Sequence, residues 1–150
     1  DAEVLAWSHL AREAALERAR MLDRGPRKGL LHGVPMGVKD IIDSHDQPTT
    51  YGSPIYKKHQ PFADAATAAL AKEAGAILLG KTNIPEFAAG ANTVNAVFGA
   101  TRNPWNLALS ASGSTGGGAA GLAAGLFPLA DGSDFGGSLR TPAAFCGVYG

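Results

Sequence analysis

The sequence predicts an α/β protein with a largely parallel sheet, and three stretches in its first half carry this prediction. The apolar run GVPMGVKDIID at residues 33–43 indicates a buried strand that breaks near Lys39. Residues 64–72 have a helical pattern with Asp64 as the predicted N-cap, and the apolar segment AILLG at 76–80 follows as a second strand. A helix between two buried strands is typical of a parallel crossover, so the two strands are expected to be neighbours.

The other regular elements are predicted to be helices that cover this sheet. Residues 1–23 carry an apolar stripe at a spacing of three and four that includes Trp7, which predicts one helix ending at Gly25. Residues 116–126 are rich in alanine and glycine, so this helix can press closely against neighbouring backbone. The segment LRTPAAF predicts a last helix with Pro142 in its first turn.

Composition excludes several classes of protein. The 150 residues are 45% hydrophobic and 17% charged, which suits one globular domain with a real core. Thirteen basic residues balance thirteen acidic ones, so no net charge favours nucleic acid or an anionic membrane. The single cysteine excludes an internal disulfide and any thiol-rich metal site, and no stretch is long and apolar enough for a transmembrane helix.

Two serines lie inside separate glycine clusters in the last third of the chain. Ser114 is in GSTGGG and Ser138 is in GSDFGGS, so bare backbone N–H groups can approach a ligand beside each hydroxyl. Serine beside glycine is common in loops, and Lys39 alone is most simply a lysine whose ammonium reaches solvent from a strand end. Each of the three residues is therefore a weak signal when it is taken alone.

Five strings occur in order and together carry a resemblance: GVPMGVKD, GKTNIPEF, NPWN, GSTGGG and GSDFGGSLRTPAAFCG. In these strings, and in the intervals of 75 and 24 residues between Lys39, Ser114 and Ser138, the chain resembles the amidase signature family of serine hydrolases. The resemblance implies a mixed, largely parallel sheet flanked by helices. It also implies one domain over 1–150, with an N-terminal helix and connector at 1–30 and a catalytic core segment at 31–150, apparently truncated at its C-terminus.

The resemblance implies an amidohydrolase that cleaves a carboxamide to an acid plus ammonia or an amine through an acyl-enzyme. Ser138 would attack the carboxamide carbon, Ser114 would pass the proton, and neutral Lys39 would be the final base. The implied oxyanion hole consists of backbone amides: Phe135, Gly136 and Gly137. Desolvation is the physical means of lowering the pKa of such a lysine, whereas Asp40 would oppose it if its carboxylate pointed the same way.

Four further residues are expected to support the two serine loops. The resemblance implies a cis peptide before Ser114, where Gly113 reduces crowding, and a supporting hydrogen bond from the hydroxyl of Thr115. Asp134 and Arg140 are expected to pair around the nucleophile loop, or else Arg140 is simply exposed. The family usually has glycine at the position of Ser112, so this side chain is a departure that bears on the loop conformation.

The stretch 81–106 has too many glycines, prolines and asparagines for regular structure, and its length points to a functional loop. The resemblance implies that its backbone near one short segment lines the acyl pocket: Phe87, Ala88, Ala89 and Gly90. For Phe98 and Trp105, aromatic packing that fixes the loop to the core is at least as good an interpretation.

Two alternatives stay open. One lies within the family: the amidase subunit of a glutamyl-tRNA amidotransferase, which releases ammonia from glutamine, although IPEFAAGANT differs from the form associated with that subunit. The other is a dinucleotide-binding module, since the glycines at 116, 118 and 121 satisfy G-x-G-x-x-G with Asp131 or Asp134 downstream. That fingerprint must follow a strand, and NPWNLALSAS is not predicted to be one.

The expected partner is a small-molecule amide, with no direct nucleic-acid or membrane contact, no metal and no organic cofactor. A homodimer is compatible with the sequence. A cytoplasmic location is expected, and because the chain does not begin with Met a removed leader stays open.

Overall fold

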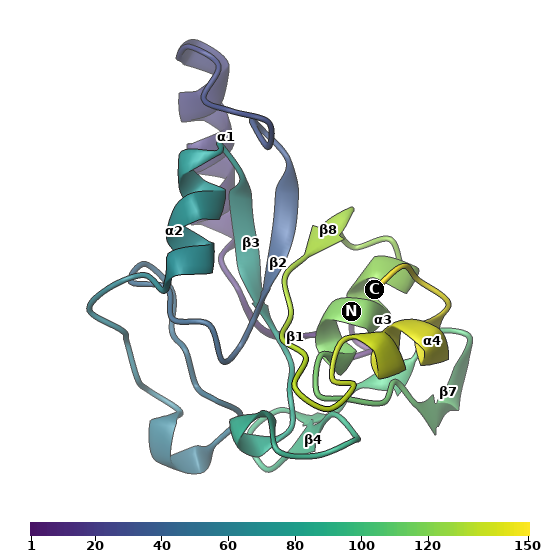
Figure 1. The fold of residues 1–150 in the computed structure, drawn as a ribbon. Coiled ribbons are helices and arrows are strands. Elements are labelled where there is room, and N and C mark those ends of the chain that lie inside the picture. The colour runs from purple at the N-terminus through teal and green to yellow at the C-terminus, as the bar shows by residue number, and fades with distance from the viewer.

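A four-stranded sheet organises the chain in the computed structural model, which describes residues 1–150 (Figure 1). Its strand order is β1-β3-β2-β8, with β1 at Trp7–Leu10, β3 at Ile77–Thr82, β2 at Pro35–Lys39 and β8 at Leu129–Ala130. Strand β2 pairs in parallel with β3 and β8, whereas β1 pairs with β3 in antiparallel. The predicted α/β class and the mixed, largely parallel sheet are therefore confirmed.

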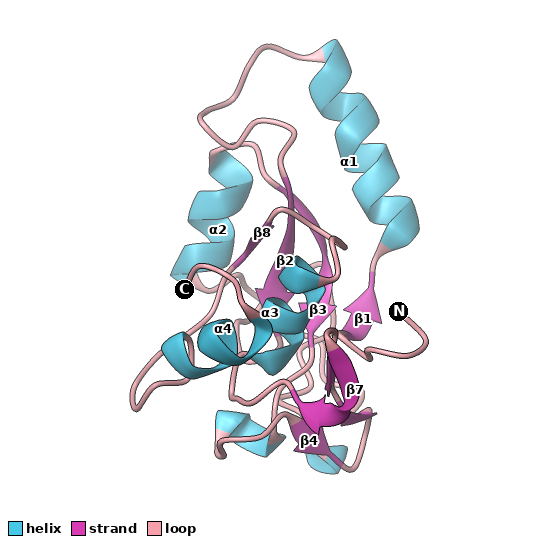
Figure 2. Ribbon diagram, turned by 90° about the vertical axis from the view of Figure 1, so that its right-hand side faces the viewer, coloured by secondary structure: helices cyan, strands magenta, loops and turns pink.

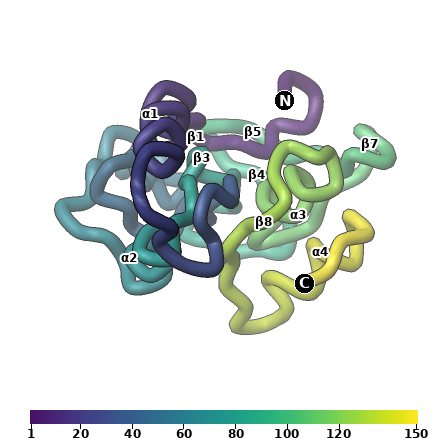
Figure 3. The backbone as a smooth tube through the Cα atoms, turned by 90° about the horizontal axis from the view of Figure 1, so that it is seen from above, coloured from purple at the N-terminus to yellow at the C-terminus, as the bar shows by residue number.

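The chain has four helices: α1 at Arg12–Arg24, α2 at Ala66–Glu73, α3 at Gly116–Ala123 and α4 at Arg140–Cys146. Helices α1 and α2 lie on opposite sides of β2 and β3 (Figures 2 and 3). Helix α3 contacts β2, β3 and β8, and α4 packs on α3. The helices predicted near 64–72, 116–126 and from 140 onward are confirmed, and α4 includes Pro142 as expected.

Alternation along the strands separates two faces of the sheet. The face toward α2 carries Met36, Val38 and Leu78, which pack with Ala68 and Ala76. On the other face, Ile77 packs with Ala15 and Leu22 of α1. The register pairs Val38 with Lys81 and Lys39 with Thr82, so the two buried lysines belong to opposite faces.

The small residues of α3 allow a very close approach to the sheet, as the sequence predicts. A Cβ at Gly117 would overlap the backbone of Asn83, one residue beyond β3, and a Cβ at Gly121 would overlap the ring of Phe127. Any larger residue at these two positions would push α3 away from the carboxyl ends of β2 and β3. The glycines are thus what brings the segment around Ser114 to the edge of the sheet.

The N-terminal helix predicted over 1–23 is wrong for its first part. Residues 7–10 form β1, and the helix begins only at Arg12 and ends at Arg24, next to Gly25. Strand β1 finds its backbone partners on β3, and Trp7 packs edge-on against Phe127 at 4.9 Å between ring centroids rather than within a helix. Tertiary pairing therefore overrides the local helical spacing.

Asp64 does not cap α2. The N-cap residue is Ala65 without a side-chain hydrogen bond, and the Asp64 carboxylate instead binds Lys72 Nζ at 2.9 Å and 3.0 Å. The backbone N–H of His45 also donates to Asp64, at 2.8 Å. Asp64 therefore links the loop at His45 to helix α2 and does not cap the helix.

The remaining elements are short. They comprise 3-10 turns η1 at Pro54–Tyr56 and η2 at Glu86–Ala88, and strands β4 at Val94–Asn95, β5 at Gly99–Ala100, β6 at Arg102–Asn103 and β7 at Asn106–Ser110. The stretch 81–106 is mostly irregular, as predicted, but β7 lies where NPWNLALSAS was predicted to contain no strand. It pairs only with β6, in a two-stranded ribbon outside the main sheet, so it cannot supply the central strand that a dinucleotide fingerprint follows.

Candidate active site

Lys39 is the last residue of β2, and its side chain is fully buried at the carboxyl edge of the sheet. Its Nζ donates to Ser114 Oγ at 2.9 Å, to Ser133 Oγ at 2.8 Å and to the Ser133 carbonyl at 3.3 Å. The lysine and the first of the two predicted serines are therefore brought into direct hydrogen-bond contact from positions 75 residues apart.

Burial lowers the pKa of Lys39 from its ordinary value of 10.5 to about 8, while the carboxylates of Asp131 and Asp134 act in the opposite direction. Asp40 does not add to them, because its carboxylate turns to Thr50 and accepts hydrogen bonds from the Thr50 N–H and hydroxyl. The lowered pKa increases the share of Lys39 that is a neutral amine at neutral pH, and only the neutral amine can accept a proton.

The loop that holds Ser114 has an unusual backbone. The Gly113–Ser114 peptide bond is cis, as the resemblance implies, and a Cβ at Gly113 would stand only 3.1 Å from the backbone N of Asn92. Ser112 has φ of +63°, a left-handed conformation that explains why glycine would suit this position. Its hydroxyl donates to the Ala91 carbonyl at 3.1 Å, so the departure from glycine adds a contact and leaves the loop in place.

The hydrogen bond predicted for the Thr115 hydroxyl is wrong. Thr115 is 5% exposed, and its Oγ1 is buried without a hydrogen-bond partner. Its Cγ2 and Oγ1 lie against Gly132. The backbone of Thr115 makes the useful contact instead, because its N–H donates to the Ser138 carbonyl at 3.0 Å and joins the two serine loops.

Ser138 lies half-buried in the loop before α4. The structure brings it beside the Ser114 loop through the Thr115 backbone, but its hydroxyl makes no hydrogen bond to Ser114 or to Lys39. Of the predicted chain of three residues, the structure therefore contains the Lys39–Ser114 hydrogen bond. The Ser138 hydroxyl makes no hydrogen bond, although its loop adjoins that of Ser114.

Asp134 organises this nucleophile loop. Its carboxylate accepts the backbone N–H groups of Gly137, Leu139 and Arg140 at 2.7–3.2 Å. It also accepts Arg140 Nε and Nη2, both at 2.9 Å, so the predicted pair is present although Arg140 is exposed. The hydrogen bond from Arg140 is the largest cause that holds the pKa of Asp134 far below its usual range.

The three backbone amides predicted for the oxyanion hole differ in their hydrogen bonding. Gly137 N–H is occupied by Asp134 at 2.7 Å. The N–H groups of Phe135 and Gly136 donate to no group of the chain, and both residues are exposed. Two of the three predicted amides are thus free to bind a ligand, and the third is not.

The predicted acyl-pocket segment lies in a tight turn, with positive φ at Phe87, Ala88 and Gly90. Phe87 is 47% exposed and packs edge-on against Tyr56 at 6.0 Å between ring centroids. The segment leads into Ala91–Asn92, which touches Gly113, so these residues approach the Ser114 loop from the side of the aromatic cluster.

Sequence reasoning missed Ser133 and Asp131, which both contact Lys39. Ser133 binds Nζ, and Asp131 Oδ1 accepts the Lys39 backbone N–H at 2.6 Å. Both lie in the ADGSD string directly before the nucleophile loop, and the parallel pairing of β8 with β2 is what places them beside Lys39. The sequence shows this string but does not show that the strand before it pairs with β2.

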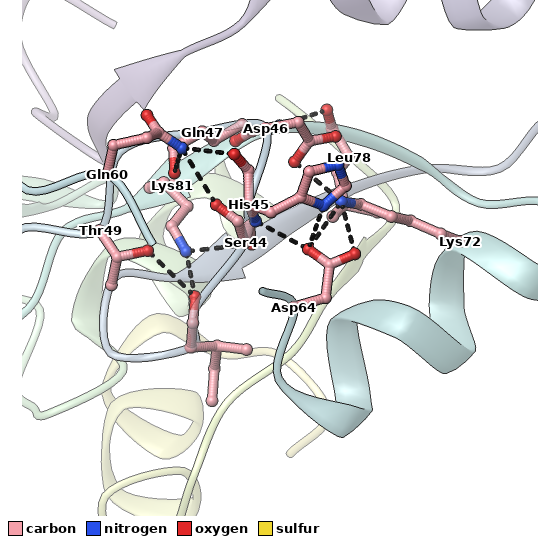
Figure 4. Close-up of polar contacts among 11 residues, drawn as sticks. Ser44, His45, Asp46, Gln47, Thr49, Gln60, Asp64, Lys72, Leu78 and Lys81 are labelled. Carbon is pink, nitrogen blue, oxygen red and sulfur yellow. Dashed lines mark hydrogen bonds and ion pairs between the residues drawn. The ribbon is translucent and has the colours of Figure 1, made fainter. Parts of the chain in front are cut away.

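A second buried lysine, Lys81, was also missed. Its Nζ binds the Ile42 carbonyl and Ser44 Oγ on the far face of the sheet, and burial lowers its pKa to about 8 (Figure 4). Gln60 Nε2 donates to the carbonyls of Ser44, His45 and Gln47 in the same view. Lys81 and Gln60 thus hold the turn that follows Lys39.

His45, Asp46 and Asp64 cluster near this turn with ligand atoms close enough for a metal ion. Lys72 Nζ already binds Asp46 at 2.8 Å and Asp64 at 2.9 Å (Figure 4). The ammonium compensates the two carboxylates, and we assign the cluster to stabilising the loop.

Comparison with known proteins identifies the family of the chain. The model of the Amidase family matches residues 1–150, so the chain belongs to this family. It is 44% identical over 154 residues to a glutamyl-tRNA(Gln) amidotransferase subunit from Thermobifida fusca (strain YX), covering 100% of this chain and 31% of that protein. Among solved structures it is similar to 6-aminohexanoate cyclic dimer hydrolase complexed with substrate, with a TM-score of 0.90, 36% identity and coverage of 97% of this chain and 30% of that one.

The peptide amidase of Stenotrophomonas maltophilia is similar too, with a TM-score of 0.88, 36% identity and coverage of 95% of this chain and 31% of that one. The chain therefore spans about a third of the length of these relatives. None of its helices has the length and hydrophobicity needed to span a membrane. The two solved neighbours are named as enzymes, a cyclic dimer hydrolase and a peptide amidase.

Proposed function

We propose that this chain carries the catalytic centre of an amidohydrolase that uses Ser138 as nucleophile, Ser114 as proton relay and Lys39 as base. One observation carries the proposal: a fully buried lysine, whose pKa is lowered to about 8, donates to Ser114 Oγ at 2.9 Å beside the Ser138 loop. An exposed ammonium at that position would be protonated at neutral pH and useless as a base.

In the proposed reaction, Ser138 Oγ bonds to the carboxamide carbon while its proton passes through Ser114 to the neutral Lys39 amine. The Phe135 and Gly136 amides stabilise the oxyanion, and Gly137 contributes through the turn that Asp134 fixes. Collapse breaks the C–N bond, and the proton on Lys39 returns through Ser114 to the leaving nitrogen. Water then attacks the acyl-enzyme, releases the acid and restores Ser138.

The reaction requires one movement in this structure. The Ser138 hydroxyl, which makes no hydrogen bond, must come to donate to Ser114, while the Thr115–Ser138 backbone hydrogen bond keeps the two loops together. Catalytic hydrogen bonds commonly tighten only when substrate binds.

The test is reaction of the full protein with a fluorophosphonate, followed by peptide mapping of the adduct. We expect labelling at Ser138, and we expect Ser138→Ala, Ser114→Ala and Lys39→Ala each to remove most amide turnover, by about 1,000-fold or more. Ser8→Ala, whose hydroxyl donates to the Lys81 carbonyl, is the control and should keep its activity. Full turnover in folded Ser138→Ala would overturn the proposal.

A second candidate is the glutaminase subunit of a glutamyl-tRNA amidotransferase, favoured by the name of the relative from Thermobifida fusca. Glutaminase turnover, measured with and without partner subunits, separates the candidates. Activity on glutamine that depends on a partner supports the second candidate, whereas turnover of small amides by the protein alone supports a stand-alone amidase. Three further expectations stay predictions: a small-molecule amide as partner, a homodimer and a cytoplasmic location.

A further inference from the structure

Asp131 connects the strand that carries Lys39 to the loop that carries Ser138. It directly follows β8, which runs parallel to β2, so both strands end at the same edge of the sheet. Its backbone N–H donates to the Gly37 carbonyl at 3.1 Å, and its Oδ1 accepts the Lys39 N–H at 2.6 Å. One residue therefore binds β2 on both sides of Val38.

Asp131 is a partly buried residue. It borders a cavity of about 40 Å³ whose other lining residues include Thr115, Leu139 and Ala143. Apart from the Lys39 N–H, no group of the chain donates to this carboxylate, and no cation forms an ion pair with it. Partial burial raises the pKa of the Asp131 carboxyl, and no side chain forms an ion pair with it.

The other charged groups around Lys39 differ from Asp131 in this respect. Asp134 is paired with Arg140. On the other face of the sheet, Lys81 donates to the Ile42 carbonyl and Asp40 accepts the Thr50 N–H. Helix α3 contributes no titratable side chain. Asp131 is therefore the carboxylate without an ion-pair partner, and its charge raises the pKa of Lys39 more than that of Asp134 does.

We propose that Asp131 is a positioning residue for the lysine base: it fixes the main chain at Lys39, and its negative charge raises the pH above which Lys39 is a neutral amine. This inference rests on the proposed function of Lys39. When Lys39 takes the proton from Ser114, the ionised carboxylate of Asp131 stabilises the ammonium that forms and remains ionised itself. Asp131 contacts no reacting atom in this scheme.

The test is Asp131→Asn, which removes the charge and keeps an oxygen able to accept the Lys39 N–H. Without the opposing charge, the Lys39 ammonium is less stable, so the acid limb of kcat/KM against pH should move to lower pH by roughly half a pH unit or more. A 13Cε-lysine NMR titration, with the Lys39 signal assigned through Lys39→Arg, should show the same shift without any substrate. Asp23→Asn makes the same change in net charge on the exposed side of α1 and should move neither midpoint.

The outcomes separate this inference from the proposed function. Loss of activity in Asp131→Asn with an unmoved limb and an unmoved NMR midpoint would leave only a structural role and overturn the inference. If wild-type turnover proves independent of Lys39, the proposed function fails, while the NMR midpoint still decides whether Asp131 acts on the lysine. Should Asp131→Asn fail to fold, Asp131→Ser removes the charge with a smaller acceptor and must give the same direction of shift.

Discussion

Lys39→Met should change how stability depends on pH. Because burial holds the pKa of Lys39 at about 8 in the folded protein against 10.5 ordinarily, the unfolded chain holds a proton that the folded protein has lost between these values. The free energy of unfolding therefore rises with pH between about 8 and 10.5, and below about pH 8 the cost of burying the charged ammonium is present in full. At about 1.36 kcal/mol per pH unit, the whole effect is about 3 kcal/mol, of which about 2 kcal/mol falls between about pH 7 and pH 9.5.

The assay is urea unfolding followed by circular dichroism at both pH values. Wild type gains stability with pH through Lys39 and also through Lys81, whose pKa burial likewise lowers to about 8. Lys39→Met should lose about 2 kcal/mol of this gain, whereas Lys58→Met, at an exposed position, should keep it. Comparing the gain cancels the pH-independent loss of the hydrogen bonds from Lys39 Nζ. An identical gain in Lys39→Met and wild type would refute the assignment of Lys39 as a buried, destabilised cation.

Two further predictions concern packing. Gly117→Ala should destabilise the protein by about 3 kcal/mol in thermal or urea unfolding, because the methyl group would overlap the Asn83 backbone, while Gly136→Ala, with open space around it, should change stability little; equal effects would contradict the close approach of α3. Thr115→Val should raise stability by about 1 kcal/mol, because it replaces a buried hydroxyl without a partner by a methyl group of similar shape. A clear loss of stability in Thr115→Val would show that this hydroxyl makes a bond after all.

Local sequence patterns were sufficient to predict those segments whose structure does not depend on distant parts of the chain. The end of β2 at Lys39 and the glycine requirement of α3 follow from the sequence, because apolar runs and small residues leave few alternatives. Strand β1 could not be found this way, since residues 7–10 satisfy a helical spacing and become a strand only because β3 offers backbone partners. Non-local pairing decides between two locally acceptable structures.

The candidate site shows the same division. Ser114, Ser138 and Lys39 were predicted through motif order, and Asp134 with Arg140 was expected as a pair around the nucleophile loop. Ser133 and Asp131 were missed as partners of Lys39, because they reach it only through the pairing of β8 with β2. The Thr115 hydroxyl was assigned a bond from its residue type, whereas its surroundings supply no partner.

The two tryptophans stand in contrasting places, and this gives the protein two optical reporters. Trp7 is half-buried against Phe127 at the sheet, so its emission follows the loss of the core. Trp105 is 72% exposed and is tethered by its indole N–H to the Cys146 carbonyl at 2.6 Å, at the end of α4. Collisional quenching should therefore act mainly on Trp105, and its emission would follow movements of the helix behind the nucleophile loop while the sheet remains intact.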